Sequence, residues 1–393
     1  MVNSLRACAI LAALLGAQAP LAAAHGGAHG HREGGAPLAA SAAFDAEGGL
    51  WAASLEDRRL VLRRSTDFGR SWSAPRMVVD ASERVAAEGD ARPKLAAGPA
   101  GEIYLSWTRP LSKPYTGEIR FSRSLDGGRS FSAPFTVHTD RQEITHRFDA
   151  LAVARDGRVF LVWIDKRDQE AARARGLDYR GAAVYYAVSD DRGASFRGDF
   201  KVADHSCECC RIALAPLADG NVAALWRHVF APNVRDHALA VLAPDGRALR
   251  VRRATFDHWR VDACPHHGPS LGVDSAGRLH AVWFTGAAGR EGVHYGRLLE
   301  RGVGGERRVG GESAAHADLA ISGTRVALTW KEFDGARSRL RAMVSEDGGE
   351  HWREMGLAVT DGASDQPRAL AWRGRFFVFW NTQHEPLSVR TLP

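Results

Sequence analysis

Cysteine is scarce and unevenly placed in this chain of 393 residues, which has 5 cysteines. Cys8 lies near the N-terminus, and the others are Cys207, Cys209, Cys210 and Cys264. After the N-terminus there is no apolar run long enough to cross a bilayer, so we expect no membrane span there. There is also no block of like charges, and the net charge of +6 is spread along the chain. This pattern favours a solvated basic surface, and no nucleic-acid partner is expected.

The N-terminus has the features of a secretory signal. Arg6 supplies a positive charge, residues 9–15 are apolar, and an Ala-x-Ala site ends at Ala24. We therefore expect residues 1–24 to be a signal peptide and the mature protein to be periplasmic or secreted, where disulfides can form. Residues 25–36 are rich in His and Gly. We expect a disordered leader there, although such a tract can also collect divalent metals.

One pattern recurs seven times in residues 37–393, which we expect to form a single domain. A glycine turn precedes a short apolar segment that ends, in six copies, at tryptophan. The copies are Gly49–Ser54, Gly101–Trp107, Gly157–Trp163, Gly220–Trp226, Gly277–Trp283, Gly323–Trp330 and Gly374–Trp380. The alternation of their side chains predicts strands. A further strand is expected after each copy, at residues 58–65, 118–124, 182–189, 236–242, 291–298, 336–344 and 387–392.

A second motif, Ser-x-Asp-x-Gly-x-x-Trp/Phe, follows four of these copies. Its occurrences are Ser65–Trp72, Ser124–Phe131, Ser189–Phe196 and Ser345–Trp352, and Ala243–Gly246 is a degenerate copy. The aspartate is expected to cap amides of a turn, the glycine to adopt a positive φ, and the aromatic residue to pack the turn down. The motif is structural and says nothing about catalysis.

With these motifs the chain resembles the sialidase-like Asp-box β-propellers over nearly all of its mature length. The resemblance implies an all-β propeller with blades of four antiparallel strands around a channel. Seven strand copies favour seven blades, the last one closed by the segment near Ala36 to Ser41. Six blades with an extra hairpin is the alternative.

In such a ring the residue before the first strand of each blade faces one mouth of the channel. The residues at that position are Arg92, His146 with Arg147, Cys209 to Arg211, His266 with His267, His316, and Asp365 with Gln366. Four consecutive blades therefore present His or Cys at the same phase of the repeat. We expect a small ligand or a metal to bind at this mouth.

The sulfur and imidazole groups predict a soft transition metal, copper or zinc. The predicted ligands are Cys207, Cys209, Cys210, Cys264, His266 and His267, with His146 and His316 as outer candidates. Arg211 would help to keep a thiolate ionised. Disulfides are the other interpretation, because four cysteines can form two bridges in three pairings.

The resemblance also implies a glycosidase alternative. A sialidase would have a Phe/Tyr-Arg-Ile-Pro motif, three arginines that hold a carboxylate, a Tyr/Glu nucleophile pair and an aspartic acid. The motif is missing from this chain and no glutamate is well placed. The candidates for the remaining roles are Arg92, Arg147, Arg211, Arg227, Asp168 and Tyr179. A third possibility is a non-catalytic module that docks a periplasmic protein partner.

Overall fold

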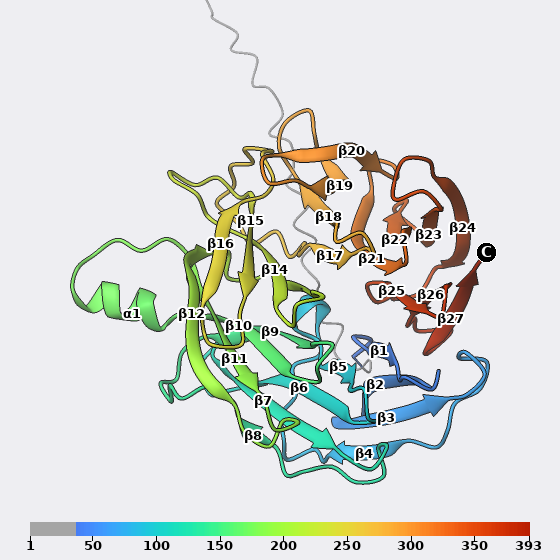
Figure 1. Ribbon diagram of the computed structural model, residues 1–393, viewed down its shortest axis with the longest axis horizontal. Helices are drawn as coiled ribbons and strands as arrows, with labels where there is room; N and C mark the ends of the chain where they lie inside the picture. The colour runs from blue at the N-terminus through green and yellow to red at the C-terminus, as the bar shows by residue number, and fades with distance from the viewer. Residues whose placement is uncertain (1–36) are drawn as a thin grey trace, which may run out of the picture. The chain divides into compact units, whose positions relative to one another are not determined.

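The computed structural model describes residues 37–393, in which seven antiparallel sheets are arranged around a common axis (Figure 1). The predicted signal peptide and leader, residues 1–36, lie outside the described residues. Six of the sheets have four strands and the last has three. The prediction of seven blades is confirmed, and the alternative of six blades is wrong.

Each sheet runs from an inner to an outer strand in chain order. Blades 1 to 3 comprise β1 Ser41–Phe44, β2 Leu50–Glu56, β3 Arg59–Ser65, β4 Arg76–Val79; β5 Lys94–Ala97, β6 Ile103–Pro110, β7 Gly117–Ser124, β8 Phe135–Thr136; β9 His146–Val153, β10 Val159–Asp165, β11 Ala182–Ser189, β12 Arg197–Ser206. Blades 4 and 5 comprise β13 Ala213–Pro216, β14 Val222–Arg227, β15 His237–Leu242, β16 Ala248–Arg253; β17 Ser270–Val273, β18 Leu279–Thr285, β19 Gly292–Leu298, β20 Val303–Val309. Blades 6 and 7 comprise β21 Ala314–Ser322, β22 Arg325–Phe333, β23 Ser338–Ser345, β24 Arg353–Thr360; β25 Arg368–Trp372, β26 Arg375–Trp380, β27 Ser388–Leu392.

The repeated tryptophans fill the spaces between the blades. Six of them are almost fully buried: Trp107, Trp163, Trp226, Trp283, Trp330 and Trp380. Each lies at or near the end of the second strand of its blade, and alternate residues of that strand face the two neighbouring sheets. Because both faces of a propeller blade are covered, the second strands are apolar and buried along nearly their whole length. This double burial produced the repeated sequence signal.

The ring is closed by side chains at a seam between blades 7 and 1. We predicted that the segment near Ala36 to Ser41 would complete the last blade, and this was wrong. Ser41 begins β1, the inner strand of blade 1, and the last blade has only β25, β26 and β27. Asn381 Nδ2 donates to the Leu38 carbonyl oxygen (2.8 Å), and the Ala40 amide donates to Asp365 Oδ2 (3.1 Å). The predicted segment therefore lies against blade 7 but is held by side chains.

The four Ser-x-Asp-x-Gly turns have one hydrogen-bond pattern in common. The glycine amide donates to the serine hydroxyl oxygen, 2.7–2.8 Å away. The aspartate Oδ1 accepts from the backbone amide four residues on, at 2.9–3.0 Å. The aromatic residue reaches the preceding blade: Phe196 packs on Phe121, and Trp72 Nε1 donates to the Leu387 carbonyl oxygen. Each turn therefore fastens its blade to the one before it, and the turn at Trp72 spans the seam.

We expect the aspartates of these turns to make the protein less stable in acid. Hydrogen bonds from Ser71 and Ser65 hold the pKa of Asp67 at about 2, below its usual 3.8. For Asp191 burial raises the pKa, but hydrogen bonds from Ser195 outweigh it and bring the pKa to about 2. A depressed carboxyl pKa stabilises the folded state above about pH 3.8, and that contribution is lost as the pH falls toward about 2.

Urea unfolding followed by tryptophan fluorescence should show this loss between about pH 5 and about pH 2, the range in which carboxyl groups titrate. The double variant Asp67→Asn, Asp191→Asn is expected to lose less stability on acidification than the wild type. Asp178→Asn, at an exposed position outside the turns, is the matched control. Identical pH dependence of the double variant and the wild type would contradict the prediction.

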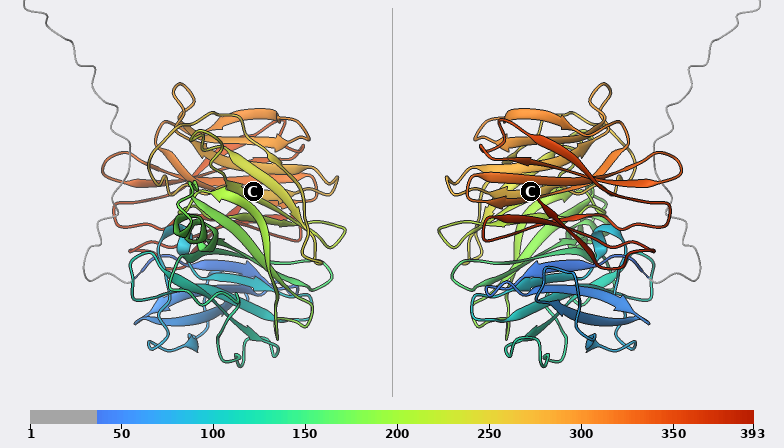
Figure 2. Two further views of the ribbon diagram at one scale, coloured as in Figure 1. Left: turned by 90° about the vertical axis from the view of Figure 1, so that its left-hand side faces the viewer. Right: turned by 90° about the vertical axis from the view of Figure 1, so that its right-hand side faces the viewer.

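The two helices within residues 37–393 mark one face of the ring. The 3-10 helix η1 (Gly89–Ala91) lies in the connection from β4 to β5, and α1 (Arg167–Ala174) lies between β10 and β11. In the left-hand side view both lie toward the same face, as expected for connections from outer to inner strands and from second to third strands (Figure 2). Among residues 37–393 no helix is long and apolar enough to cross a membrane.

Candidate metal centre

The cysteines lie in two connections of this same face. Cys207, Cys209 and Cys210 lie between β12 and β13, and Cys264 lies between β16 and β17. Pairing with the end of β14 fixes the first connection, because the Cys207 amide donates to the Arg227 carbonyl oxygen (2.9 Å). The two connections enter neighbouring blades, so the repeat places them side by side.

Asp90 ties the two connections together. Its Oδ2 accepts backbone N–H groups from Arg211 (3.2 Å) and Gly268 (3.1 Å), which follow the two cysteine segments. The approach at Gly268 is so close that a Cβ there would lie 2.7 Å from the Arg211 amide nitrogen. Only glycine fits, so the sequence Cys-Pro-His-His-Gly allows the second segment to contact the first.

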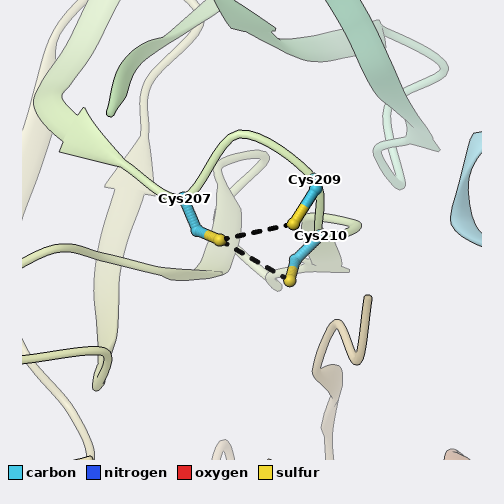
Figure 3. A group of neighbouring side chains, drawn as sticks. All are labelled: Cys207, Cys209 and Cys210. Atoms are coloured by element: carbon cyan, nitrogen blue, oxygen red, sulfur yellow. Dashed lines mark hydrogen bonds between the residues drawn. The ribbon is translucent and has the colours of Figure 1, made fainter. Parts of the chain in front are cut away.

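Three thiols converge at the first connection. Cys207 Sγ lies 3.7 Å from Cys209 Sγ and 3.8 Å from Cys210 Sγ (Figure 3). A disulfide would bring sulfurs to about 2.05 Å. All three are free thiols and all three are buried.

A second group of donors shares one of these cysteines. The ligand atoms of Cys209, Cys264 and His266 lie within 4.8 Å of one another, as do those of Cys207, Cys209 and Cys210. Cys264 and His266 are exposed, whereas Cys209 is buried. The structure therefore brings together five of the six predicted ligands.

His267, the sixth, faces elsewhere. Its ring stacks on Phe284 (4.1 Å between ring centroids) and on His316 (4.5 Å). Burial, helped by the charge of Arg227, lowers the pKa of His267 to about 3 and keeps the imidazole neutral. A cavity of about 10 Å³, enough for one water molecule, is lined by both histidines.

His146, the other outer candidate, lies in a different polar cluster. It is fully buried, and its ring stacks on His138 with 3.9 Å between centroids. Its Nδ1 is 3.1 Å from the Gly117 carbonyl oxygen, and its Nε2 faces the carboxylates of Asp140 (3.5 Å) and Asp165 (3.7 Å). These contacts are typical of a structural histidine.

The electrostatics of the cysteine loop favour one thiolate. Hydrogen bonds from Cys209 and Cys210 hold the pKa of the Cys207 thiol well below its usual range. The hydrogen bond that each of them makes to Cys207 is the main cause that raises the pKa of Cys209 and of Cys210. Arg235 Nη1 also donates to Cys207 Sγ at 3.6 Å. These interactions make Cys207 the most acidic of the three thiols.

Arg92 and Arg211 lie at the axis, where both form buried ion pairs. Arg92 donates to both oxygens of Asp365 (2.7 and 2.8 Å), and Arg211 Nη1 donates to Asp90 Oδ1 (3.1 Å). Gln366 Oε1 lies 3.3 Å from a nitrogen of each arginine. Burial raises the pKa of Asp90, but the charge of Arg211 and its amide bond outweigh this and lower it overall. Both arginines are neutralised by carboxylates of the chain itself.

The other two arginines are also engaged. Arg227 is buried and donates to the carbonyl oxygens of Arg235, His267 and Phe284. Arg147 is 3.4 Å from Glu88.

The last two catalytic candidates lie away from the axis. Asp168 is in α1, and Tyr179 is in the segment between α1 and β11. Asp168 accepts from Tyr185 and pairs with Lys201 (3.1 Å). The Tyr179 hydroxyl donates to Asp204 (2.6 Å). Burial, and to a smaller extent this hydrogen bond, raises the pKa of Tyr179. A phenol with a raised pKa is poorly suited to act as a nucleophile.

Comparison with known proteins relates the chain to others by fold alone. No protein-family model and no curated protein matches the sequence. A solved polysaccharide lyase has a TM-score of 0.52 at 12% identity, over 87% of this chain and 86% of its own. A mutant α-L-arabinofuranosidase from Fusarium graminearum, in complex with an iminosugar inhibitor, has a TM-score of 0.51 at 11% identity. The match covers 78% of this chain and 92% of that protein. A mutant of the NanB sialidase from Streptococcus pneumoniae has a TM-score of 0.48 at 10% identity, over 75% of this chain and 65% of its own.

At such identities the likeness shows a shared propeller fold and leaves the function to be argued from the site. Sequence reasoning missed two residues of that site. Asp90 is two positions before Arg92 and could have been found at the same phase of the repeat. Arg235 lies in the connection between β14 and β15, which opens on the same face, and no motif in the sequence marks it.

Proposed function

We propose that this protein is an exported β-propeller that binds a soft transition metal, Cu(I) or Zn(II). The ligands would be Cys207, Cys209, Cys210, Cys264 and His266. Thiolate sulfur favours these ions over harder ones. Of these ligands Cys264 and His266 are exposed and the other three are buried, so an ion would enter from the side of Cys264 and His266.

The separation of the sulfur atoms carries the proposal. With metal–sulfur bonds of about 2.3 Å, two corners of a tetrahedron lie about 3.8 Å apart. The observed separations of 3.7 and 3.8 Å have this length. The thiols are therefore spaced as ligands of one ion without any movement of the backbone. The donated hydrogen bond from Arg235 supports an ionised sulfur.

The alternatives have less support. A disulfide would need Cys207 Sγ to move by more than 1.5 Å toward a partner, from 3.7 Å to about 2.05 Å. A sialidase would need arginines free to hold a carboxylate, whereas Arg92 and Arg211 already hold Asp365 and Asp90. The protein-docking alternative stays a prediction.

Metal binding and thiol protection test the proposal together. Purified protein, reduced and freed of metal, is titrated anaerobically with Cu(I) and separately with Zn(II) against a chromogenic chelator. The cysteines are then alkylated. We expect tight binding of both metals, with the thiols of the cluster protected only in the metal-loaded protein.

Two variants separate the cysteine site from the histidine-rich leader. Cys207→Ser removes a ligand of the cluster, and His25→Ala, His29→Ala, His31→Ala removes the imidazoles of the leader. We expect metal binding to fall in the first variant and to persist in the second. The proposal fails if thiols alkylate equally with and without metal, or if only the leader variant loses binding.

A further inference from the structure

The metal ligands form two groups of three that share one sulfur. Cys207, Cys209 and Cys210 make up the inner group, and Cys209, Cys264 and His266 make up the outer group. The five donors exceed the four that a single tetrahedral ion accepts. Cys209 is the one donor common to both groups, and a thiolate sulfur has enough lone pairs to bind two soft ions.

From this arrangement we propose that the site holds two Cu(I) ions bridged by the Cys209 sulfur, but only one Zn(II). The proposal rests on the proposed function and adds the number of ions to it. Zn(II) in structural sites almost always takes four ligands, so two zinc ions would need more donors than this cluster has. Cu(I) is stable with three soft ligands, and each group supplies three. The chemistry involves no electron transfer: each thiol releases its proton to solvent as it binds the ion.

The surrounding charges fit a site of this kind. Four thiolates and two Cu(I) ions leave a net charge of −2, which needs compensation in a partly buried place. Arg235 donates to the inner sulfur of Cys207, and Arg227 raises the positive potential at Cys207 and Cys210. Glu208, whose side chain would add negative charge, is instead paired with Lys166 (2.5 Å) at the start of α1.

The two groups differ in exposure, and this difference sets an order of loading. All three inner cysteines are buried, whereas Cys264 and His266 are exposed. An ion from solution therefore reaches the outer group first, and the shared sulfur gives it a path to the inner group. The outer ion exchanges with solution, and the inner ion is retained.

Copper and zinc stoichiometry of the leader variant, His25→Ala, His29→Ala, His31→Ala, tests the inference without interference from those imidazoles. We expect 2 Cu(I) but 1 Zn(II) per chain, as the donor count requires. Copper–copper scattering is expected in the X-ray absorption spectrum of the fully loaded protein. A Cu(I) chelator should remove the two ions in separate phases, the outer one first.

Two further substitutions in the leader variant isolate the outer ion. Cys264→Ser and His266→Ala change exposed side chains, so the fold is expected to survive, which circular dichroism would check. Each should reduce the copper stoichiometry to one and abolish the copper–copper signal. A single Cu(I) per chain before these substitutions, with Cys264 still open to alkylation, would overturn the bridged pair and leave the proposed function standing. No bound copper or zinc at all would remove both.

Discussion

Replacing Cys209 by serine is expected to lower the affinity of the protein for Cu(I) by at least about a hundredfold, since loss of an outer-shell partner alone costs about 10–100-fold at metal sites. Cys209 belongs to both groups of donors, so its loss leaves two ligands in each. A serine hydroxyl is a hard donor that stays protonated at neutral pH and cannot replace a thiolate for a soft ion. Competition with a chromogenic Cu(I) chelator under anaerobic conditions measures the change.

His384→Ala is the matched control for this substitution. His384 is exposed on a connection of the same face, between β26 and β27, and pairs with Asp361 (3.2 Å) far from the cysteines in sequence. Its removal should leave the copper affinity unchanged. Unfolding of Cys209→Ser in urea must be compared with that of the wild-type apo-protein, because Cys209 is buried. An unchanged copper affinity in a folded Cys209→Ser protein would contradict the assignment.

Replacing Arg92 by alanine is expected to destabilise the fold by about 3–5 kcal/mol at pH 7, the usual cost of removing one partner of a buried ion pair. The side chains of Arg92 and Asp365 are 3% and 5% exposed. Without the guanidinium, the Asp365 carboxylate keeps only amide hydrogen bonds, from Ala40 and Gln366. The free energy of unfolding in urea measures the loss.

Two comparisons strengthen the test of Arg92. Arg197→Ala breaks an exposed pair with Asp190, at 2.7 Å and 55% exposure of the arginine, and should cost no more than about 1 kcal/mol. The double variant Arg92→Ala, Asp365→Ala should lose less than the sum of the two single variants, because either substitution alone leaves a buried charge. A loss below about 1 kcal/mol for Arg92→Ala would mean that the arginine is solvated and free to bind a ligand.

The sequence predicted the blades well because each one repeats the same physical requirement. A strand covered on both faces must be apolar throughout, so Val159–Asp165 and Val222–Arg227 stand out as buried runs. The position of a residue within the repeat then predicted that Cys207 and Cys264 lie on neighbouring blades. The number of strands in the last blade left no such mark, because a ring can close through side chains such as Asn381 and Asp365.

The details of the site were harder to predict for two reasons. His266 and His267 are adjacent, and adjacent side chains point in different directions, so the sequence could not tell which one faces the thiols. The ion pairs at the axis join residues that are remote in the chain, such as Arg92 with Asp365 and Arg211 with Asp90. A candidate arginine at the right phase looks the same in the sequence whether its charge is free or already neutralised.

The seam between blades 7 and 1 also fixes when the ring can form during synthesis. Its hydrogen bonds join residues far apart in the chain, for example Leu38 with Asn381, separated by 343 positions. Blade 1 can therefore complete its contacts only after blade 7 has formed. Until then, Trp72 of blade 1 has no Leu387 carbonyl oxygen to which it can donate. Blades 3, 4 and 5, which bear the cysteines, are complete well before that point. Because none of these connections depends on the seam, the four thiols can come together before the ring closes.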